Sequence, residues 1–256
     1  MASNERISRR GIIVNMLQTI GLFLLSGCDN LSQTEWFSNL LGSSEGLTRR
    51  IQRLIAPRKA MAREYTEADL STVFPTNGTT NPGTSEYAAL VENQFADWKL
   101  IVGGLVNQPM SFSLSELRQL PSRTQITRHD CVEGWSAIAK WKGVKLGEIL
   151  IRVSPLPSAR YVIFYCADAD SDGQDYYESI DLEDAYHAQT ILAYELNDRI
   201  LPIENGAPIR LRLERQLGYK MAKYVMRIEL VETFKSIEGG NGGYWEDQGY
   251  EWYAGI

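Results

Sequence analysis

The residues best suited to chemistry surround Cys131, which directly follows a predicted strand. The segment reads Arg128-His129-Asp130-Cys131-Val132-Glu133-Gly134-Trp135-Ser136, so that a thiol stands among a cation, an imidazole and two carboxylates. A thiolate in such surroundings can act as a nucleophile, a redox group or a ligand of a soft metal. The alternative is a buried structural cysteine, because free cysteine is among the most buried residue types.

Three further roles for this thiol have to be weighed. A disulfide between Cys131 and Cys166 is chemically possible in an oxidising compartment. A Cys–His hydrolase would pair Cys131 with His129 or His187, but the sequence carries no local signature of such a family. A zinc site is disfavoured because the histidines and the other cysteines lack the usual paired spacing.

A second group of polar residues comes later in the chain. The segment 204–210 reads Glu-Asn-Gly-Ala-Pro-Ile-Arg, and 218–223 reads Gly-Tyr-Lys-Met-Ala-Lys. Asn205, Arg210 and Lys223 could hold a phosphorylated or amide-rich ligand, since loop amides and fixed cations suit such groups. The same residues are equally compatible with a turn followed by solvated charges.

The elements that position these residues are expected to be short and of both kinds. A strand over 98–102 ends at Gly103-Gly104, and Ser113 with Glu116 forms a capping box for a helix that Pro121 ends. Further strands are expected over 160–165, 191–196 and 224–230, with a polar turn over 168–174, a helix over 181–187 and a hairpin turn at Asn197-Asp198. This mixture predicts the α+β class.

Composition limits the class of protein. The 256 residues are 44% hydrophobic and 23% charged, which excludes collagen-like, coiled-coil and wholly disordered chains. The net charge of −6 argues against nucleic-acid binding. The apolar run from Gly11 to Gly27 is interrupted by Asn15 and Gln18, so it is too short of apolar residues to span a bilayer. We therefore expect an acidic protein with one main folded domain.

The first 27 residues are typical of an export signal. Arg9 and Arg10 precede a weakly apolar stretch, as in twin-arginine signals, and Leu25-Ser26-Gly27-Cys28 resembles a lipobox. A plain amphipathic helix with a chance arginine pair is the alternative. Cleavage would leave Cys28 as a lipid-modified N-terminus, and the following Asp29 resembles an inner-membrane retention signal. The mature protein is then expected in the periplasm, anchored to the inner membrane.

Four segments together resemble a known family in their order and spacing. They are the segment around Cys131, the strand over 161–166, the turn over 205–210 and the segment 218–223. This pattern resembles the sulfite oxidase superfamily of molybdopterin enzymes, and within it the catalytic subunits of bacterial periplasmic methionine sulfoxide reductase systems. The resemblance runs from about residue 74 to 230. It implies a sulfite-oxidase-type molybdopterin-binding fold of mixed short strands and helices, with a molybdenum–molybdopterin cofactor.

The resemblance also implies roles for the cofactor residues. Cys131 would be the thiolate ligand of molybdenum, and soft thiolate ligation suits a redox metal. Asn205, Arg210 and Lys223 match positions that hold the pterin and its phosphate. Four more candidates match less closely: Cys166 stands where that relative has threonine, Met221 and Ala222 replace a Gly-Ile pair, and Asn77 lies in a turn loosely similar to an upstream cofactor-binding loop.

The implied activity is two-electron oxygen-atom transfer on a small sulfur-containing or related oxo substrate. Arg128, His129, Glu133 and Tyr219 are candidates for lining the substrate pocket, with scaffold hydrogen bonding as their alternative role. The rival function is a non-catalytic lipoprotein binding module with structural cysteines. The domains expected are a signal peptide over 1–27, a tether with the cofactor-binding loop over 28–85 and the oxidoreductase domain over 86–256.

Electrons would have to come from a separate protein. The sequence has no Cys-x-x-Cys-His haem motif, too few cysteines for an iron–sulfur cluster and no Gly-x-Gly-x-x-Gly fingerprint. We expect a membrane haem b or quinol-linked subunit as the partner, with a soluble cytochrome as the lesser option. The protein itself is expected to be monomeric and to act on a small molecule. The Gly-, Trp- and Tyr-rich tail from Gly239 matches no pattern of this family.

Overall fold

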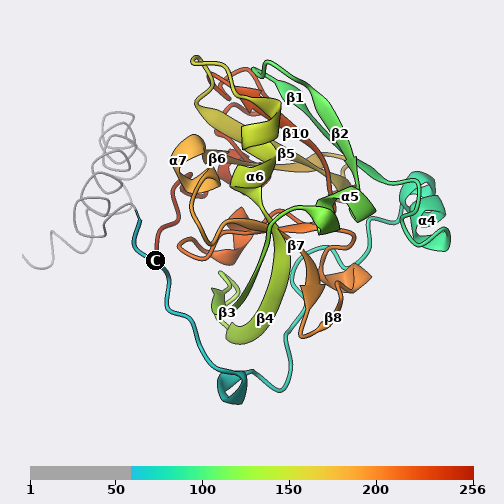
Figure 1. Ribbon diagram of the computed structural model, residues 1–256, viewed down its shortest axis with the longest axis vertical. Helices are drawn as coiled ribbons and strands as arrows, with labels where there is room; N and C mark the ends of the chain where they lie inside the picture. The colour runs from blue at the N-terminus through green and yellow to red at the C-terminus, as the bar shows by residue number, and fades with distance from the viewer. Residues whose placement is uncertain (1–58) are drawn as a thin grey trace, which may run out of the picture. The chain divides into compact units, whose positions relative to one another are not determined.

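The computed structural model describes residues 59–256, which Figure 1 draws in colour. The predicted signal over 1–27, the lipid-attachment site Cys28 with Asp29, and the first part of the tether lie outside the described residues. In the described part, no helix is long and apolar enough to cross a membrane.

Short strands dominate the described part of the chain. They are β1 (Lys99–Gly104), β2 (Met110–Ser113), β3 (Ser122–Asp130), β4 (Ser136–Lys145), β5 (Tyr161–Ala169), β6 (Asp175–Asp181), β7 (Ile191–Leu196), β8 (Arg199–Ile200), β9 (Arg210–Arg212) and β10 (Val225–Val231). The α-helices are α4 (Ser85–Glu92), α5 (Leu114–Gln119), α6 (Leu146–Val153), α7 (Leu182–Ala185) and α8 (Tyr244–Asp247). Single 3₁₀ turns are η1 (Glu67–Asp69), η2 (Ile203–Asn205) and η3 (Gly218–Lys220).

The strands form two five-stranded sheets. The first has the order β2-β1-β10-β5-β6, in which β1 and β10 are parallel and the other pairs antiparallel. The second has the order β3-β4-β7-β8, and β9 pairs with the other end of β7. The long β3–β4 hairpin is in register from Ser122↔Val144 to Asp130↔Ser136. The loop 131–135 therefore stands at the end of a rigid two-stranded arm.

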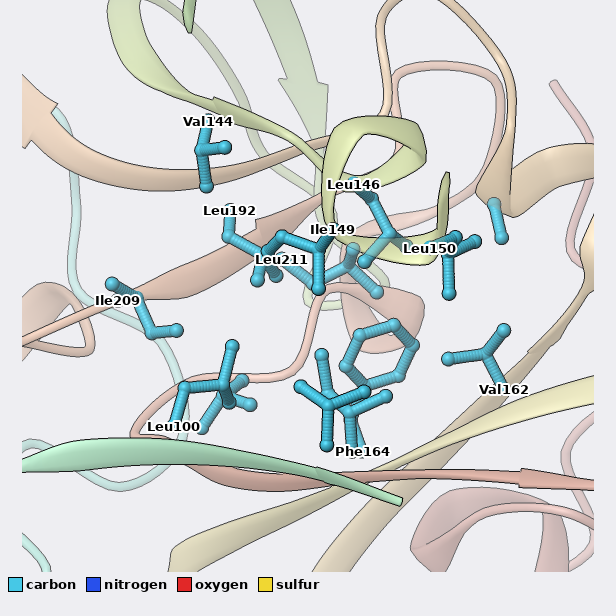
Figure 2. Packing of buried hydrophobic residues seen from close by; sticks show 14 of the residues in the cluster. Leu100, Val144, Leu146, Ile149, Leu150, Val162, Phe164, Leu192, Ile209 and Leu211 are labelled. Carbon is cyan, nitrogen blue, oxygen red and sulfur yellow. The ribbon is translucent and has the colours of Figure 1, made fainter. Parts of the chain in front are cut away.

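One hydrophobic core joins the two sheets. The amphipathic helix α6 buries Leu146, Ile149, Leu150 and Val153, which follow the i, i+3, i+4, i+7 spacing of one helix face. Figure 2 shows the side chains of this helix beside Leu192 and Leu211 of the second sheet, with Val162 and Phe164 of β5 across from them. The core thus holds both sheets at a fixed separation, and the loops that leave them are positioned accordingly.

Most of the expected elements are confirmed. The capping box forms, since the Ser113 side chain accepts from Glu116 N and Glu116 accepts from Ser113 N. The hairpin turn also forms, with Asn197 and Asp198 at φ of 50° and 61°, the left-handed conformation that short hairpin loops favour. The mixed α+β class is confirmed.

Three expected boundaries were wrong. Strand β5 continues to Ala169, so that Asp168 lies within a strand and is buried rather than in the polar turn. The helix expected to reach His187 ends at Ala185. Tyr224 precedes β10 with a φ of 51°, and a register shift between Val225 and Arg227 breaks the expected alternation. A bulge of this kind redirects side chains, so Val225 is buried together with Tyr224.

The described part of the segment 28–85 runs along the domain. Ala62 N donates to Gln189 Oε1 at 2.7 Å, and Tyr65 N donates to Ile126 O at 2.9 Å. Phe74 packs edge-on against Trp141 with ring centroids 5.1 Å apart. These contacts bring the turn at Asn77 next to the segment 218–223, 141 residues or more away in the chain.

Candidate active site

Cys131 lies at the tip of the β3–β4 arm and is buried. A tight loop holds it, because Cys131 N donates to Trp135 O at 2.9 Å and Gly134 N donates to Cys131 O at 3.1 Å. Burial raises the pKa of the Cys131 thiol, and the backbone amides of Glu133 and Val132 partly oppose this. Cys131 and Cys166 are both free thiols, so the structure does not contain the disulfide that was weighed.

His129 is fully buried behind this loop and is fixed by a cation. Its Nδ1 atom lies 2.9 Å from Arg212 Nη1. Because a guanidinium has donors only, Nδ1 accepts this bond and the ring proton is on Nε2. Burial and the charge of Arg212 hold the pKa of His129 well below its usual value, so the ring is neutral. Nε2 has no hydrogen-bond partner among the described residues and points toward Gly218, where a Cβ would stand 2.5 Å from it.

His187 lies away from this group. Its Nε2 is 3.1 Å from Ala60 O, and its Nδ1 accepts from Gln189 N at 3.3 Å. The structure therefore gives no support to a hydrolase in which His187 would activate Cys131.

Arg210 and Asn205 form a buried group in which three donor atoms lack an acceptor among the described residues. Arg210 Nη1 donates to Asn205 O at 3.2 Å, but Arg210 Nε and Nη2 and Asn205 Nδ2 have no partner in the described part of the chain. Burial lowers the pKa of Arg210 to about 9, and the neighbouring charge of Arg212 adds to this effect. Buried donors normally have partners, so this arrangement is typical of a site for an acceptor-rich ligand.

Lys223 is the second buried cation and comes from the other predicted segment. Its Nζ donates to Asn77 O at 2.7 Å and to Thr79 O. Burial lowers the pKa of Lys223 to about 8, with Arg210 as the next contribution. Gly206 makes room for this side chain, because a Cβ at that position would lie 2.8 Å from Lys223 Cβ.

A pocket opens beside Lys223. Its lining includes six of the candidates that sequence analysis named, which are Asn77, Cys166, Tyr219, Met221, Ala222 and Lys223. Asp168, Tyr176 and Trp245 complete the walls together with neighbouring residues. Cys131, Asn205 and Arg210 are not in its lining, but Gly218 is, and Gly218 contacts both His129 and the backbone of Asp130. The pocket and the Cys131 loop are therefore adjacent through Gly218.

The remaining substrate candidates are more exposed. Arg128 pairs with Asp130 at 2.9 Å and faces a separate hollow with Tyr65 and Glu214. Glu133 is exposed and accepts from Trp135 Nε1 at 3.0 Å. These contacts fit the alternative role of scaffold hydrogen bonding for Arg128 and Glu133, whereas Tyr219 lies in the pocket.

Sequence reasoning missed the residues that support the site from behind. Arg212 forms a bidentate ion pair with Glu214 at 2.9 and 2.7 Å, and it stacks on Trp141 at 4.3 Å. The signal was present, since Arg210 and Arg212 alternate with Ile209, Leu211 and Leu213 in a strand-like apolar run. Charges in such a run are expected to be buried. Asp168 and Trp245 carried no comparable signal.

Comparison with known proteins was made by family model, sequence and structure. The model for the oxidoreductase molybdopterin binding domain matches residues 87–236. The putative protein-methionine-sulfoxide reductase subunit YedZ1 of Azospira oryzae is 37% identical over 251 residues, which are 98% of this chain and 89% of that protein.

Two further relatives are protein-methionine-sulfoxide reductase catalytic subunits named MsrP. That of Xanthomonas axonopodis pv. citri is 38% identical over 54% of this chain and 46% of its own, and that of Ralstonia nicotianae is 34% identical over 60% and 49%. The chain thus spans about half the length of these two relatives. The sulfane dehydrogenase SoxCD of Paracoccus pantotrophus superposes with a TM-score of 0.49 at 22% identity, covering 56% of this chain and 40% of that one.

The family match covers more than half of the chain and includes Cys131, Arg210, Lys223 and most of the pocket. This match excludes the rival interpretation as a non-catalytic binding module. It also agrees with the buried donors that have no partner among the described residues, because an acceptor-rich ligand could bind them. The chain therefore belongs to the family of oxidoreductases with a molybdopterin-binding domain.

Proposed function

We propose that this chain reduces methionine sulfoxide by two-electron oxygen-atom transfer, with molybdenum bound to the Cys131 thiolate. The observation that carries the proposal is a buried thiol, Cys131, within reach of the charge of buried Arg210, which itself interacts with Lys223 and hydrogen-bonds to Asn205. Sulfoxide reduction is favoured over sulfite oxidation because three relatives are named protein-methionine-sulfoxide reductase subunits. The similarity to one of them extends over nearly the whole chain.

The residues fit the cofactor by the chemistry of their atoms. A pterin ring and a phosphate group are rich in acceptors, and Arg210 Nε, Arg210 Nη2 and Asn205 Nδ2 are buried donors that have no acceptor within residues 59–256. Arg210 and Lys223 are buried cations that form no ion pair with a carboxylate in the described part of the chain. Burying such a charge is unfavourable, and a bound anionic group would offset that free energy. A thiolate at Cys131 is a soft ligand of the kind that redox metals accept.

The chain would use these residues to bind and orient. Arg210 and Asn205 would hold the acceptor-rich ring system, while Lys223 and the loop at Asn77 would hold the phosphate end. Met221 and Ala222 would contribute backbone, and Cys166 a pocket wall. When bound, the molybdenum cofactor supplies the two-electron redox change that the protein side chains cannot. His129, held neutral by Arg212, would offer a hydrogen-bond donor at Nε2 beside the reacting centre.

The test is replacement of the proposed metal ligand. Cys131→Ser should abolish sulfoxide reduction with a dye electron donor, because a hydroxyl is a harder and weaker ligand than a thiolate. X-ray absorption at the molybdenum edge should show one sulfur ligand fewer in this variant. Cys166→Ser removes the other free thiol and should leave the sulfur coordination unchanged. Unaltered coordination in Cys131→Ser would contradict the proposal.

Export and anchoring are part of the same proposal. Residues 1–27 would direct the folded, cofactor-loaded protein through the twin-arginine route, and a lipid on Cys28 would hold it at the periplasmic face of the inner membrane. The paired arginines and the Leu-Ser-Gly-Cys sequence support this. Arg9→Lys with Arg10→Lys should leave precursor in the cytoplasm, and normal periplasmic accumulation would point to another route.

The proposed electron donor is a membrane haem b or quinol-linked subunit. All three sequence relatives are named as subunits, which supports a multi-protein system. An anchor raises the effective concentration of the enzyme near a membrane partner. Cys28→Ala, exported with a cleavable soluble signal, should keep its dye-linked activity and lose most of its quinol-linked activity. Intact quinol-linked turnover without the anchor would contradict this partner.

A further inference from the structure

The C-terminal segment, residues 239–256, lies beyond the region that the family model matches. It is nevertheless tied to the domain at several points. Trp252 Nε1 donates to Ser179 Oγ at 2.8 Å, and Leu217 N donates to Ala254 O at 2.9 Å. Tyr177 Oη donates to Asp247. The segment is therefore held in one place on the outside of β6 and η3.

The strongest of these ties is a buried ion pair. Glu246 of α8 and Glu178 of β6 both contact the ammonium group of Lys220, and all three side chains are almost completely buried. Two carboxylates around one cation are costly to bury unless the geometry is maintained. This group positions α8, and with it the neighbouring residue Trp245, relative to the pocket.

Trp245 lines the same pocket as Lys223. The polar residues of the lining include Asn77, Thr79, Asp168, Glu178 and Lys223, and its aromatic residues include Tyr176, Tyr219 and Trp245. The aromatic residues are supported by the C-terminal segment, since Tyr176 packs on Tyr244 with centroids 4.1 Å apart and Tyr250 lies 5.2 Å from Tyr219 and 5.3 Å from Trp245. Tyr219 Oη also donates to Glu251 O at 2.6 Å.

From this arrangement we infer that the C-terminal segment is a clasp that retains the molybdopterin cofactor, with Trp245 as its contact residue. The inference rests on the proposed function, because it takes the pocket beside Lys223 as the cofactor pocket. An anionic group would bind to Lys223, and a flat heteroaromatic ring would pack against the aromatic residues of the lining. The indole is rigid and is held by Tyr244 and Tyr250, so it offers this contact at a small entropic cost.

The experiment measures cofactor retention by the full-length holoenzyme. Trp245→Ala, Trp245→Phe and Gln248→Ala are purified with their cofactor, and release of the pterin is followed by its fluorescence while molybdenum is measured by mass spectrometry. Trp245→Ala should release the pterin roughly 5- to 150-fold faster than the wild type, the range expected for loss of one aromatic stacking contact. Trp245→Phe keeps an aromatic face and should lie near the wild type. Gln248 is exposed on the same segment and serves as the matched control.

Two further measurements separate the possible failures. Thermal unfolding of each variant shows whether faster release comes from loss of the fold, and Trp245→Ala should unfold within a few degrees of Trp245→Phe. Lys223→Met tests the pocket itself. If Lys223→Met loses cofactor and Trp245→Ala retains it as the wild type does, the clasp is wrong and the pocket stands. If neither variant loses cofactor, the assignment of the pocket is wrong as well.

Discussion

Two lysines of one short segment, three residues apart and both buried, have opposite surroundings. Lys220 contacts the carboxylates of Glu178 and Glu246; burial alone would lower its pKa, but the two carboxylates raise it. Among the described residues the ammonium group of Lys223 donates hydrogen bonds only to backbone carbonyls, and burial lowers its pKa to about 8. The first cation forms ion pairs with two carboxylates, whereas the second forms none in the described part of the chain, although the charge of Asp168 acts on it.

The two arginines of β9 repeat this contrast. Arg212 is fully paired with Glu214 and His129, whereas Arg210 has two guanidinium nitrogens without a partner in the described part of the chain. Because an uncompensated buried charge is costly, it persists where a ligand compensates it. The comparison therefore separates framework cations, Lys220 and Arg212, from ligand-binding cations, Arg210 and Lys223.

The largest effect should come from breaking the framework group. Lys220→Met leaves Glu178 and Glu246 buried without a counter-charge, and it should lower the free energy of unfolding by about 3–5 kcal/mol. Urea unfolding followed by circular dichroism measures this. Lys142→Met is the control, since its ion pair with Glu195 is partly exposed and should contribute less than about 1 kcal/mol. If both substitutions lowered the free energy of unfolding equally, Lys220 would not be a framework cation in the sense proposed here.

The ligand-binding cation should respond in the opposite direction. In cofactor-free protein at pH 7, Lys223→Met removes a charge whose burial is uncompensated. The free energy of unfolding should therefore rise by up to about 3 kcal/mol, from the lowering of the pKa from 10.5 to about 8. The same variant should bind molybdopterin poorly. Destabilisation of the cofactor-free protein similar to that in Lys220→Met would show that Lys223 is a framework residue too.

This contrast has a pH dependence of fixed sign. The pKa of Lys223 is lower in the folded state than in the unfolded state. The folded state is therefore favoured above pH 10.5, where the lysine is neutral in both states, and this advantage is lost as the pH falls toward 8. As the pH rises from 8 to 10.5, the free energy of unfolding of the cofactor-free wild type should thus increase relative to that of Lys223→Met. Unfolding of both proteins at matched pH values isolates Lys223 from Arg210 and other groups. A constant difference across this range would contradict the lowered pKa.

A smaller effect is expected at the second framework cation. Arg212→Lys keeps the charge but cannot maintain both the bidentate pair with Glu214 and the bond to His129, so it should cost about 2 kcal/mol of stability. His129 should then lose its fixed tautomer. Nitrogen NMR of the imidazole reads this directly, with the proton on Nε2 in the wild type and a mixture in the variant. An unchanged tautomer would mean that other contacts orient the ring.

Local signals in the sequence were sufficient for many elements of the fold. Some elements depend on residues close together in the chain, so a short stretch of sequence is enough to predict them. They are the capping box at Ser113, the hairpin at Asn197-Asp198 and the strand before Cys131. The four segments that resemble the superfamily also contain the donor group and all the candidate residues of the pocket except Asn77. The sequence by itself therefore determined the fold class, the position of the thiol and the type of cofactor.

Only the tertiary structure decided which charges are compensated. The family resemblance named Lys223 and not Lys220, but no local pattern shows which of the two is paired. Their partners are Glu178, Glu246 and the loop at Asn77, up to 146 residues away. The register shift at Val225 and the left-handed conformation of Tyr224 likewise interrupt the strand that the sequence predicts over 224–230. The place of Trp245 depends on how the tail packs onto β6 and η3. Such contacts form only when elements far apart in the sequence pack together, and a local sequence pattern does not show which elements will do so.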